Sequence, residues 1–180
     1  MTETEVRAET ADDVAAVREV VAAAFGSEDV PGLLDAMRES VAWLDLSFVA
    51  ETAGEVVGHV SFTRAWLDSP TGAVVDVLVL SPLSVRPDRQ RTGVGTVLVG
   101  HALAELAKRA EPLVFLEGSP RYYPRLGFVA GGSLGFTRPS VHIPEPAFQV
   151  VTLPTYQPGM SGALVYPDVF WRHGAVGLRP

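Results

Sequence analysis

The chain of 180 residues contains no cysteine. This excludes disulfide bonds, thiolate nucleophiles and cysteine-based zinc sites together. It also lacks any run of about 18 consecutive apolar residues, the length that a helix needs to span a bilayer. The first ten residues, MTETEVRAET, are polar and acidic and contain no apolar signal core. We therefore expect a cytoplasmic protein that makes no membrane contact.

Positive charge is scarce as well. Lysine and arginine total 14 against 21 aspartates and glutamates, which gives a formal net charge of −7. Nucleic-acid-binding proteins are usually basic, so no nucleic acid is expected as a partner. The four histidines show no metal-ligand spacing, so no metal is expected. The content of 47% hydrophobic and 19% charged residues is typical of a globular fold.

What the sequence does contain is an alternation of helical and strand-like patterns. The apolar spacing predicts helices over residues 11–25, 30–44, 95–110 and 119–128, with Val14, Val17, Val21, Ala24 and Phe25 as the buried stripe of the first. Residues 46–67 are typical of a hairpin that turns at Ala53-Gly54. Further strand-like runs lie at 111–118, 147–153 and 162–166.

The run GAVVDVLVLSPLSV, residues 72–85, is almost continuously apolar. Such a run predicts a strand buried on both faces at the centre of a sheet. Pro82 cannot donate a ladder hydrogen bond, so we expect the strand to bulge or leave its neighbour near Ser81-Pro82. Ten of the 14 prolines lie at or after Pro112, and no stretch reads as a linker. We predict one domain over 1–180, with a loop-rich C-terminal part from about residue 129 to 180.

A basic turn, RPDRQRTGVG, separates this strand from the helix that follows it. Glycines before a helix N-terminus let backbone N–H groups approach an anion, and Arg89 and Arg91 can add charged contacts. A Walker loop would need Gly-Lys-Ser/Thr, whereas Thr96 and Val97 follow Gly95. A dinucleotide fingerprint would need a small residue where Leu98 stands. The turn therefore predicts a phosphate site of another kind.

The turn resembles the Gln/Arg-x-x-Gly-x-Gly/Ala motif of the GCN5-related N-acetyltransferases (GNAT), with Gln90, Gly93 and Gly95 in its defined positions. YYPRLGF, residues 122–128, resembles a second motif of that family, and GSPRYYPRLGF with the C-terminal tail is similar to its YhbS-like branch. The resemblance implies an α/β (α+β) fold whose mixed, mostly antiparallel central sheet is splayed near Val85 and flanked by helices. It also implies an acyltransferase that moves the acetyl group of acetyl-CoA to a primary amine of a small molecule, peptide or protein.

The resemblance implies a role for each residue that fills the motifs. It assigns cofactor binding to Leu83, Ser84, Val85, Gln90, Arg91, Thr92, Gly93, Val94, Gly95, Thr96 and Ser119. The backbone of residues 91–96 would cradle the pyrophosphate, and that of residues 83–85 would pair with the pantetheine arm. Tyr123 stands where the family has its general acid. Ser119 replaces the carboxylate or histidine common in the YhbS-like branch, and it also suits a helix cap.

The general base is open on the sequence. Glu117 is the best-placed carboxylate, Asp76 is another candidate, and an amine that arrives neutral would need no base. Two other functions are also open: a non-catalytic acetyl-CoA-binding regulatory module, and an acyltransferase for a longer acyl-CoA. Acetyl-CoA and an amine are the expected partners, with a homodimer left open. The acidic balance favours a cationic amine, with residues 27–40 and the tail as pocket walls.

GGSLG, residues 131–135, matches the Gly-x-Ser-x-Gly pattern of serine hydrolases, and Asp168 and His173 follow in a suitable order. That pattern is meaningful only when a strand precedes the serine and a helix follows it. The sequence FTRPSVHIPEP after it cannot open a helix, so we do not expect a hydrolase.

Overall fold

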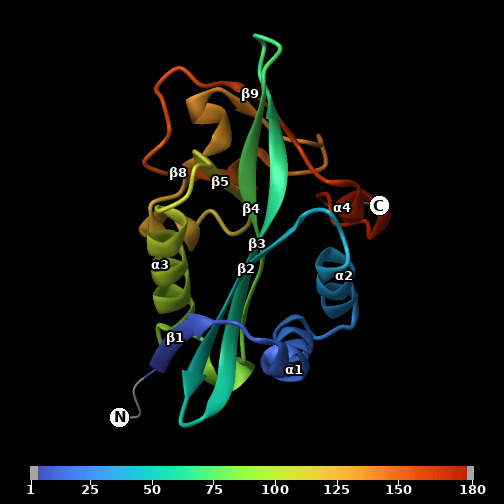
Figure 1. Cartoon of the computed structure of the whole chain (residues 1–180), viewed down its shortest axis with the longest axis vertical. Coiled ribbons are helices and arrows are strands. Elements are labelled where there is room, and N and C mark those ends of the chain that lie inside the picture. Colours follow the sequence, from blue (N-terminus) through green and yellow to red (C-terminus); the bar gives the residue numbers. More distant parts are fainter. Residues whose placement is uncertain (1–3, 178–180) are drawn as a thin grey trace.

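The computed structural model describes residues 4–177, so both ends of the predicted domain, 1–3 and 178–180, lie outside it. A nine-stranded mixed sheet organises the fold (Figure 1). Its strands follow the order β1-β2-β3-β4-β5-β8-β6, and β9 lies between the end of β3 and β7. Among the described residues, only the pairs β4–β5 and β7–β9 are parallel. The expected mixed, mostly antiparallel sheet is confirmed.

The elements largely fall where the patterns place them. The strands are β1 (Thr4–Ala8), β2 (Trp43–Thr52), β3 (Glu55–Asp68), β4 (Val74–Val85), β5 (Leu113–Glu117), β6 (Val129–Ala130), β7 (Phe136–Thr137), β8 (Phe148–Thr152) and β9 (Gly162–Val165). The α-helices are α1 (Val14–Phe25), α2 (Asp29–Arg38), α3 (Val94–Leu106) and α4 (Asp168–Arg172). Short 3₁₀ turns include η2 (Pro87–Arg89), η3 (Tyr123–Leu126) and η4 (Gly131–Leu134).

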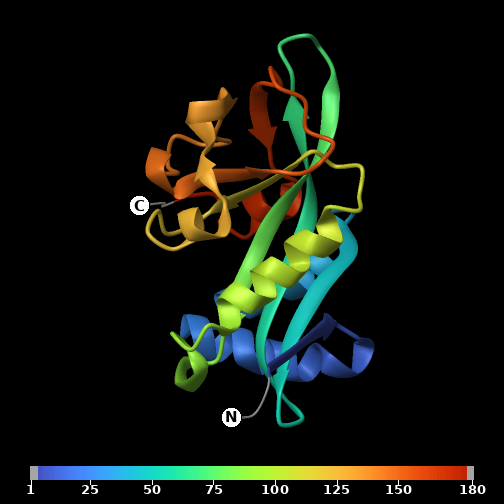
Figure 2. The ribbon, with the colours of Figure 1, turned by 90° about the vertical axis from the view of Figure 1, so that its left-hand side faces the viewer.

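Helices cover both faces of the sheet. Figures 1 and 2 show α1 and α2 on one face and α3 across the other. Val17, Val21 and Leu34 belong to the core on the first face, whereas Leu98 and Val99 belong to the core on the second. Within residues 4–177, none of the helices has the length and apolar character that crossing a bilayer requires.

The central sheet opens between β4 and β5. These strands pair only through Leu78 with Val114 and Val79 with Phe115. Beyond Val79, β4 stays with β3 while β5 continues beside β8, so the two strands diverge well before Val85. The ladder between β3 and β4 also shifts register here, between Val60 and Phe62 of β3. The bulge expected near Ser81-Pro82 is confirmed.

Four helix expectations are wrong in detail. The helix expected over 95–110 ends at Leu106, and the one expected over 119–128 is only the 3₁₀ turn η3. We expected the second helix to extend to residue 44, but α2 ends at Arg38, where the Ser40 hydroxyl donates to the Met37 carbonyl (2.8 Å) and closes the turn. Of the stripe predicted to be buried on α1, Val14 is 37% and Phe25 48% exposed, because the helix turns its Val20 into the core instead. Phe25 at the end of α1 contributes to the cleft described next.

Candidate active site

The opening between β4 and β5 is a cleft with a cavity of about 910 Å³. A second hollow of about 540 Å³ lies at the N-terminus of α3. Leu83 and Tyr122 line both hollows. The two therefore form one groove that runs from the glycine turn, the basic turn of residues 86–95, into the split sheet. The groove therefore joins the two regions of the chain that carry the acetyltransferase-like motifs.

The glycine turn is shaped to hold an anion. Gly93 precedes α3 with φ of 97°, and Arg91 takes a positive φ of 61°, which is uncommon for a residue with a side chain. The N–H groups of Val94, Gly95 and Thr96 in the first helical turn have no acceptor within the helix. They add to the positive end of the helix dipole, while Arg91 and Arg125 line the same hollow. A pyrophosphate fits this donor set.

Gly95 lets the turn approach η3. A Cβ atom at this position would lie 2.5 Å from the Tyr122 hydroxyl oxygen, so no side chain fits without movement. The Tyr122 ring in turn lies 4.8 Å from the Arg125 guanidinium carbon. The two motif segments thus form one surface because residue 95 lacks a side chain.

The end of β4 offers backbone groups to the cleft. Arg86 N–H donates to the Val57 carbonyl on β3 (2.8 Å), so Ser84, two residues earlier, also faces β3. Leu83 and Val85 therefore face the split. The Gln90 side chain donates to the Val85 carbonyl (3.0 Å), which anchors the turn to the strand. Ser84 is buried and faces away, so only Leu83 and Val85 of the three predicted residues reach the cleft.

Tyr123 lies inside the cleft. Its ring packs edge-on against Tyr122 and Phe128, with centroids 5.0 and 5.6 Å away. Gly118 makes room for it, since a Cβ atom at residue 118 would be 2.4 Å from a ring carbon of Tyr123. Burial raises the pKa of the Tyr123 phenol well above its ordinary value. The phenol therefore keeps its proton at neutral pH and can act as a donor.

Glu117 lines the same cavity at the end of β5. One carboxylate oxygen accepts the Tyr166 hydroxyl (3.0 Å), and the other accepts the Gly177 N–H (3.0 Å). Burial raises the pKa of Glu117, and these two hydrogen bonds oppose the rise without cancelling it. The split sheet thus brings the predicted acid and the favoured base into one cavity. Tyr166 and Gly177 were not anticipated because they lie 49 and 60 residues away in sequence.

Ser119 and Asp76 lie in different surroundings. Ser119 lines the cleft, and its carbonyl accepts the N–H groups of Tyr122 (3.1 Å) and Tyr123 (3.4 Å). Its hydroxyl accepts the Arg121 N–H (3.2 Å), so the residue organises the turn that leads to Tyr123. Asp76 is exposed on β4, 3.9 Å from Arg64, and outside the cleft. The structure therefore removes Asp76 as a base candidate, because β4 is still solvent-exposed at that position.

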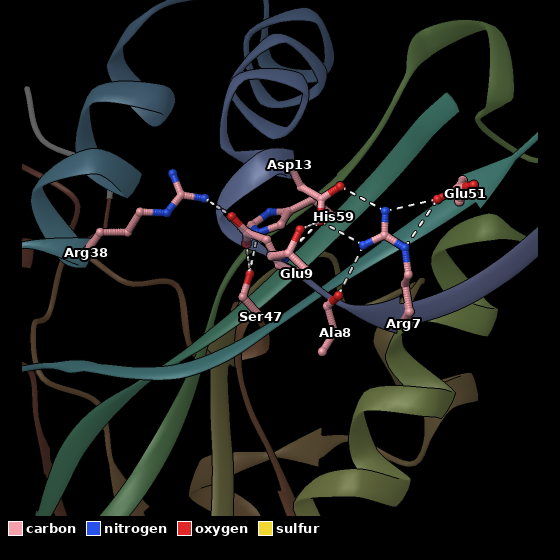
Figure 3. Close-up of polar contacts among 9 residues, drawn as sticks. Arg7, Ala8, Glu9, Asp13, Arg38, Ser47, Glu51 and His59 are labelled. Carbon is pink, nitrogen blue, oxygen red and sulfur yellow. Dashed lines mark hydrogen bonds and ion pairs between the residues drawn. The ribbon is translucent and has the colours of Figure 1, made fainter. Parts of the chain in front are cut away.

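A buried polar network that no sequence pattern predicted joins β2 and β3 to α2 and to the segment after β1 (Figure 3). His59 of β3 is fully buried and pairs in the ladder with Ser84. Its Nε2 lies 2.8 Å from the Ser47 hydroxyl and 3.2 Å from Glu9, while Ser47 and Arg38 also bind Glu9 directly. Nδ1 of His59 has no hydrogen-bond partner within residues 4–177, which fits a neutral ring protonated on Nε2.

The network fixes the charges of its members. Burial lowers the pKa of His59, even though Glu9 acts in the opposite direction. Burial alone would raise the pKa of Glu9, but hydrogen bonds from His59 and Ser47 and the charge of Arg38 hold it below its usual value. The network therefore combines a neutral histidine with an ionised carboxylate and an arginine, and it ties β3, the ladder partner of β4, to β2 and α2.

The part of the chain that the structure describes contains neither a hydrolase triad nor a metal cluster. Ser133 lies in η4, donates to the Ala130 carbonyl (2.6 Å) and is not followed by an α-helix. Among residues 4–177, no three histidine, aspartate or glutamate side chains gather as metal ligands.

Comparisons with known proteins agree on one family. A family model described as an acetyltransferase (GNAT) domain matches residues 5–131. The uncharacterized N-acetyltransferase YjhQ of Escherichia coli (strain K12) is 35% identical over 139 residues, which cover 74% of this chain and 74% of that protein.

Two solved structures are similar over almost the whole chain. The GNAT family N-acetyltransferase YhbS from Escherichia coli, in complex with CoA, superposes with a TM-score of 0.85 and 25% identity, over 96% of this chain and 94% of that one. A GNAT family acetyltransferase from Brucella melitensis, in complex with acetyl-CoA, has a TM-score of 0.74 and 30% identity, over 94% and 99%.

Proposed function

Because the chain belongs to the GNAT acetyltransferase family, we propose that it transfers the acetyl group of acetyl-CoA to a primary amine of a small molecule or peptide. One observation carries the proposal. The split between β4 and β5 joins an anion-binding helix N-terminus to a cavity that holds both Tyr123 and Glu117. Two similar proteins have been solved with CoA or acetyl-CoA bound, which supports the same donor here.

In this proposal the groove binds acetyl-CoA, the acetyl donor, along the length of the groove. The N–H groups of residues 94–96 and the Arg91 guanidinium bind the pyrophosphate. Leu83 and Val85 offer backbone groups to the amides of the pantetheine arm, as a partner strand would. Acetyl-CoA so bound supplies an acetyl thioester in the cleft, next to Tyr123.

Glu117 and Tyr123 then move protons. Glu117 accepts a proton from the incoming ammonium group, so the neutral nitrogen attacks the acetyl carbon and a C–N bond forms. As the C–S bond breaks, Tyr123 gives its phenol proton to the sulfur. The surplus proton on the new amide nitrogen restores the phenol, and Glu117 releases its own to solvent. The products are the N-acetylated amine, CoA and one proton.

Calorimetric titration with acetyl-CoA tests the first half of the proposal. We expect a dissociation constant near the micromolar level, about −8 kcal/mol. A Gly93→Asp/Gly95→Asp variant places negative charge in the anion site and should abolish the binding. Gly100→Asp adds one negative charge further along α3, where a side chain meets open space, and should retain the binding. A wild-type chain that does not bind acetyl-CoA would refute the proposal.

The Tyr123→Phe variant separates a catalyst from an acetyl-CoA-binding module. We expect kcat to fall about 100-fold or more, since general acid catalysis contributes on that scale. The dissociation constant of acetyl-CoA should stay within about threefold, because the ring remains. Tyr156→Phe, the same change outside the cleft, should behave as wild type. A variant that binds acetyl-CoA and turns over at the wild-type rate would exclude Tyr123 as the acid.

A further inference from the structure

The cleft has two halves with different walls. Leu83, Gly118, Ser119, Tyr122 and Tyr123 form the half that borders the glycine turn. Across it, the other half comes from the end of α1, from α2 and from the C-terminal segment, through Phe25, Val30, Leu33, Tyr166, Phe170 and Ala175. If the donor occupies the first half, as proposed above, the second half is left for the acceptor. The inference that follows rests on that proposed function.

The acceptor half contains one charge. Glu117 is the single charged side chain among the residues of the structure that line the cavity, and every acceptor-wall residue named above is aliphatic or aromatic. Tyr166 and Gly177 hold both carboxylate oxygens of Glu117, so its position is fixed. One half-buried carboxylate matches one cationic group, and a second charge would be desolvated there without a counter-ion.

An adjacent hollow of about 460 Å³ shares Val30, Leu33 and Ala175 with the cleft and carries Glu28 and Asp29. Both carboxylates are solvent-exposed, and Glu28 already pairs with Arg18 (2.8 Å). Ion pairs at such exposed positions contribute little to binding. Glu28 and Asp29 therefore do not offset the cost of desolvating a second ammonium group between the apolar walls of the cleft.

We propose that the acceptor is a primary amine with one positive charge and an apolar body, aromatic or branched aliphatic, whose nitrogen meets Glu117 and whose body packs between Phe25, Leu33 and Phe170. The carboxylate then fixes the nitrogen beside the thioester. The aromatic and aliphatic walls discriminate by the apolar surface that the body buries. Polyamines and polar amino compounds are poor acceptors on this basis.

A matched pair of amines tests the inference. 4-Methylbenzylamine and p-xylylenediamine share the same para-substituted benzylamine body, and the diamine carries one further ammonium group on its para substituent. With saturating acetyl-CoA, release of the CoA thiol can be followed with a thiol reagent, because the chain has no cysteine to react with it. We expect kcat/KM to be at least 30-fold higher for 4-methylbenzylamine, and spermidine to be no better than the diamine.

A charge placed in the wall should reverse the preference. Phe25 is exposed enough for Phe25→Glu to fold, and the new carboxylate offers the second ammonium a partner. We expect kcat/KM to fall about tenfold for 4-methylbenzylamine and to rise for the diamine. Val41→Glu, at a residue that is exposed and outside the cleft, should change neither.

The possible failures are distinguishable. Equal or better turnover of the diamine or spermidine by the wild-type chain would overturn this inference and leave the acetyltransferase proposal intact. A clear preference for octanoyl-CoA over acetyl-CoA would also overturn it, because the apolar half would then hold the acyl chain. No binding of acetyl-CoA would overturn the proposed function itself.

Discussion

At the scale of single residues, the hydrogen bond from Tyr166 to Glu117 sets the pH range in which we expect activity. A base must be ionised, so kcat/KM should fall as the pH drops through the pKa of Glu117, which burial raises above its ordinary value. Tyr166→Phe removes a donor that stabilises the carboxylate (3.0 Å) and so raises this pKa further. The acid limb of the kcat/KM profile should therefore move to higher pH.

The profile is measured from pH 5 to 9 for the wild type, Tyr166→Phe and the control Tyr156→Phe, whose limb should not move. An acid limb that stays in place in Tyr166→Phe would mean that a group other than Glu117 is the base. Few other bases are available in this cleft, since Glu117 is its single charged lining residue among residues 4–177 and Asp76 lies outside it.

Gly95 makes a second prediction at the residue scale. Gly95→Ala puts a Cβ atom where the Tyr122 hydroxyl lies, so acetyl-CoA should bind at least tenfold more weakly, about 1.4 kcal/mol. Tyr122→Phe removes the obstructing oxygen, and the double variant should recover most of the loss. Calorimetry on all four proteins gives the coupling between the two positions.

Gly100→Ala is the matched control on the same helix, because a side chain there meets open space. It should leave acetyl-CoA affinity unchanged and raise the free energy of unfolding by up to about 1 kcal/mol, the difference in helix propensity. If the losses in acetyl-CoA binding free energy from Gly95→Ala and Tyr122→Phe are strictly additive, the Cβ atom of residue 95 disturbs the ligand directly and not through Tyr122.

At the scale of elements, local patterns identified helices α1 to α3 and strands β2 to β5, β8 and β9, because their signals lie within a few residues. The short elements β6, β7 and α4 were not predicted. The hairpin turn Ala53-Gly54 indeed has positive φ at both residues, and Gly26 ends α1 in the left-handed conformation. The prediction that Phe25 is buried fails for a physical reason. Helical periodicity defines which residues share a face, but not how much of that face the rest of the chain covers. The segment after α1 leaves Phe25 exposed at the cleft.

Local sequence patterns could not predict the buried polar network, for a different reason. Glu9 lies 38 residues from Ser47 and 50 from His59, and only the pairing of β2 with β3 and the path after β1 bring them together. The same limit applies to Glu117, whose hydrogen-bond partners are contributed by the C-terminal segment. Sequence motifs predicted which segments would bind acetyl-CoA, whereas tertiary contacts determine what surrounds Glu117, the proposed base.

The buried polar network around His59 and Glu9 predicts that the stability of the fold depends on pH. The pKa of His59 is lower in the folded chain than in the unfolded one, mainly through burial. As the pH falls below about 6.5, His59 takes up a proton in the unfolded chain but not in the folded chain. The free energy of unfolding therefore decreases by up to about 1.4 kcal/mol per pH unit. Glu9, with a lowered pKa, adds a further loss only at more acid pH.

His59→Gln keeps an N–H donor near Ser47 and Glu9 but cannot titrate. Its free energy of unfolding, measured with urea at pH 7.5, 6.5 and 5.5, should lose the histidine-dependent slope. His142→Gln, at an exposed position, should retain the wild-type slope. A slope that is unchanged in His59→Gln would mean that this histidine is already charged in the folded chain.

At the scale of the whole molecule, β3 connects the parts that build the cleft. It pairs with β2 and β4 along its length and with β9 at its end, where Trp66 lies opposite Val165. The C-terminal part also reaches the cleft through Gly177 and through the pairing of β8 with β5. We therefore propose that residues 4–177 unfold as one cooperative unit.

Unfolding in urea tests this proposal, because the three tryptophans Trp43, Trp66 and Trp171 lie on β2, β3 and α4. A Trp43→Phe/Trp66→Phe variant leaves Trp171 as a reporter of the C-terminal part. Its fluorescence transition should coincide with that of far-UV circular dichroism. Acetyl-CoA at 100 times its dissociation constant should stabilise both signals equally, by about 2.7 kcal/mol, because a ligand that binds only the folded chain stabilises every segment that unfolds with its site. An earlier Trp171 transition that acetyl-CoA does not shift would mean that the acceptor wall can open while the donor site stays folded.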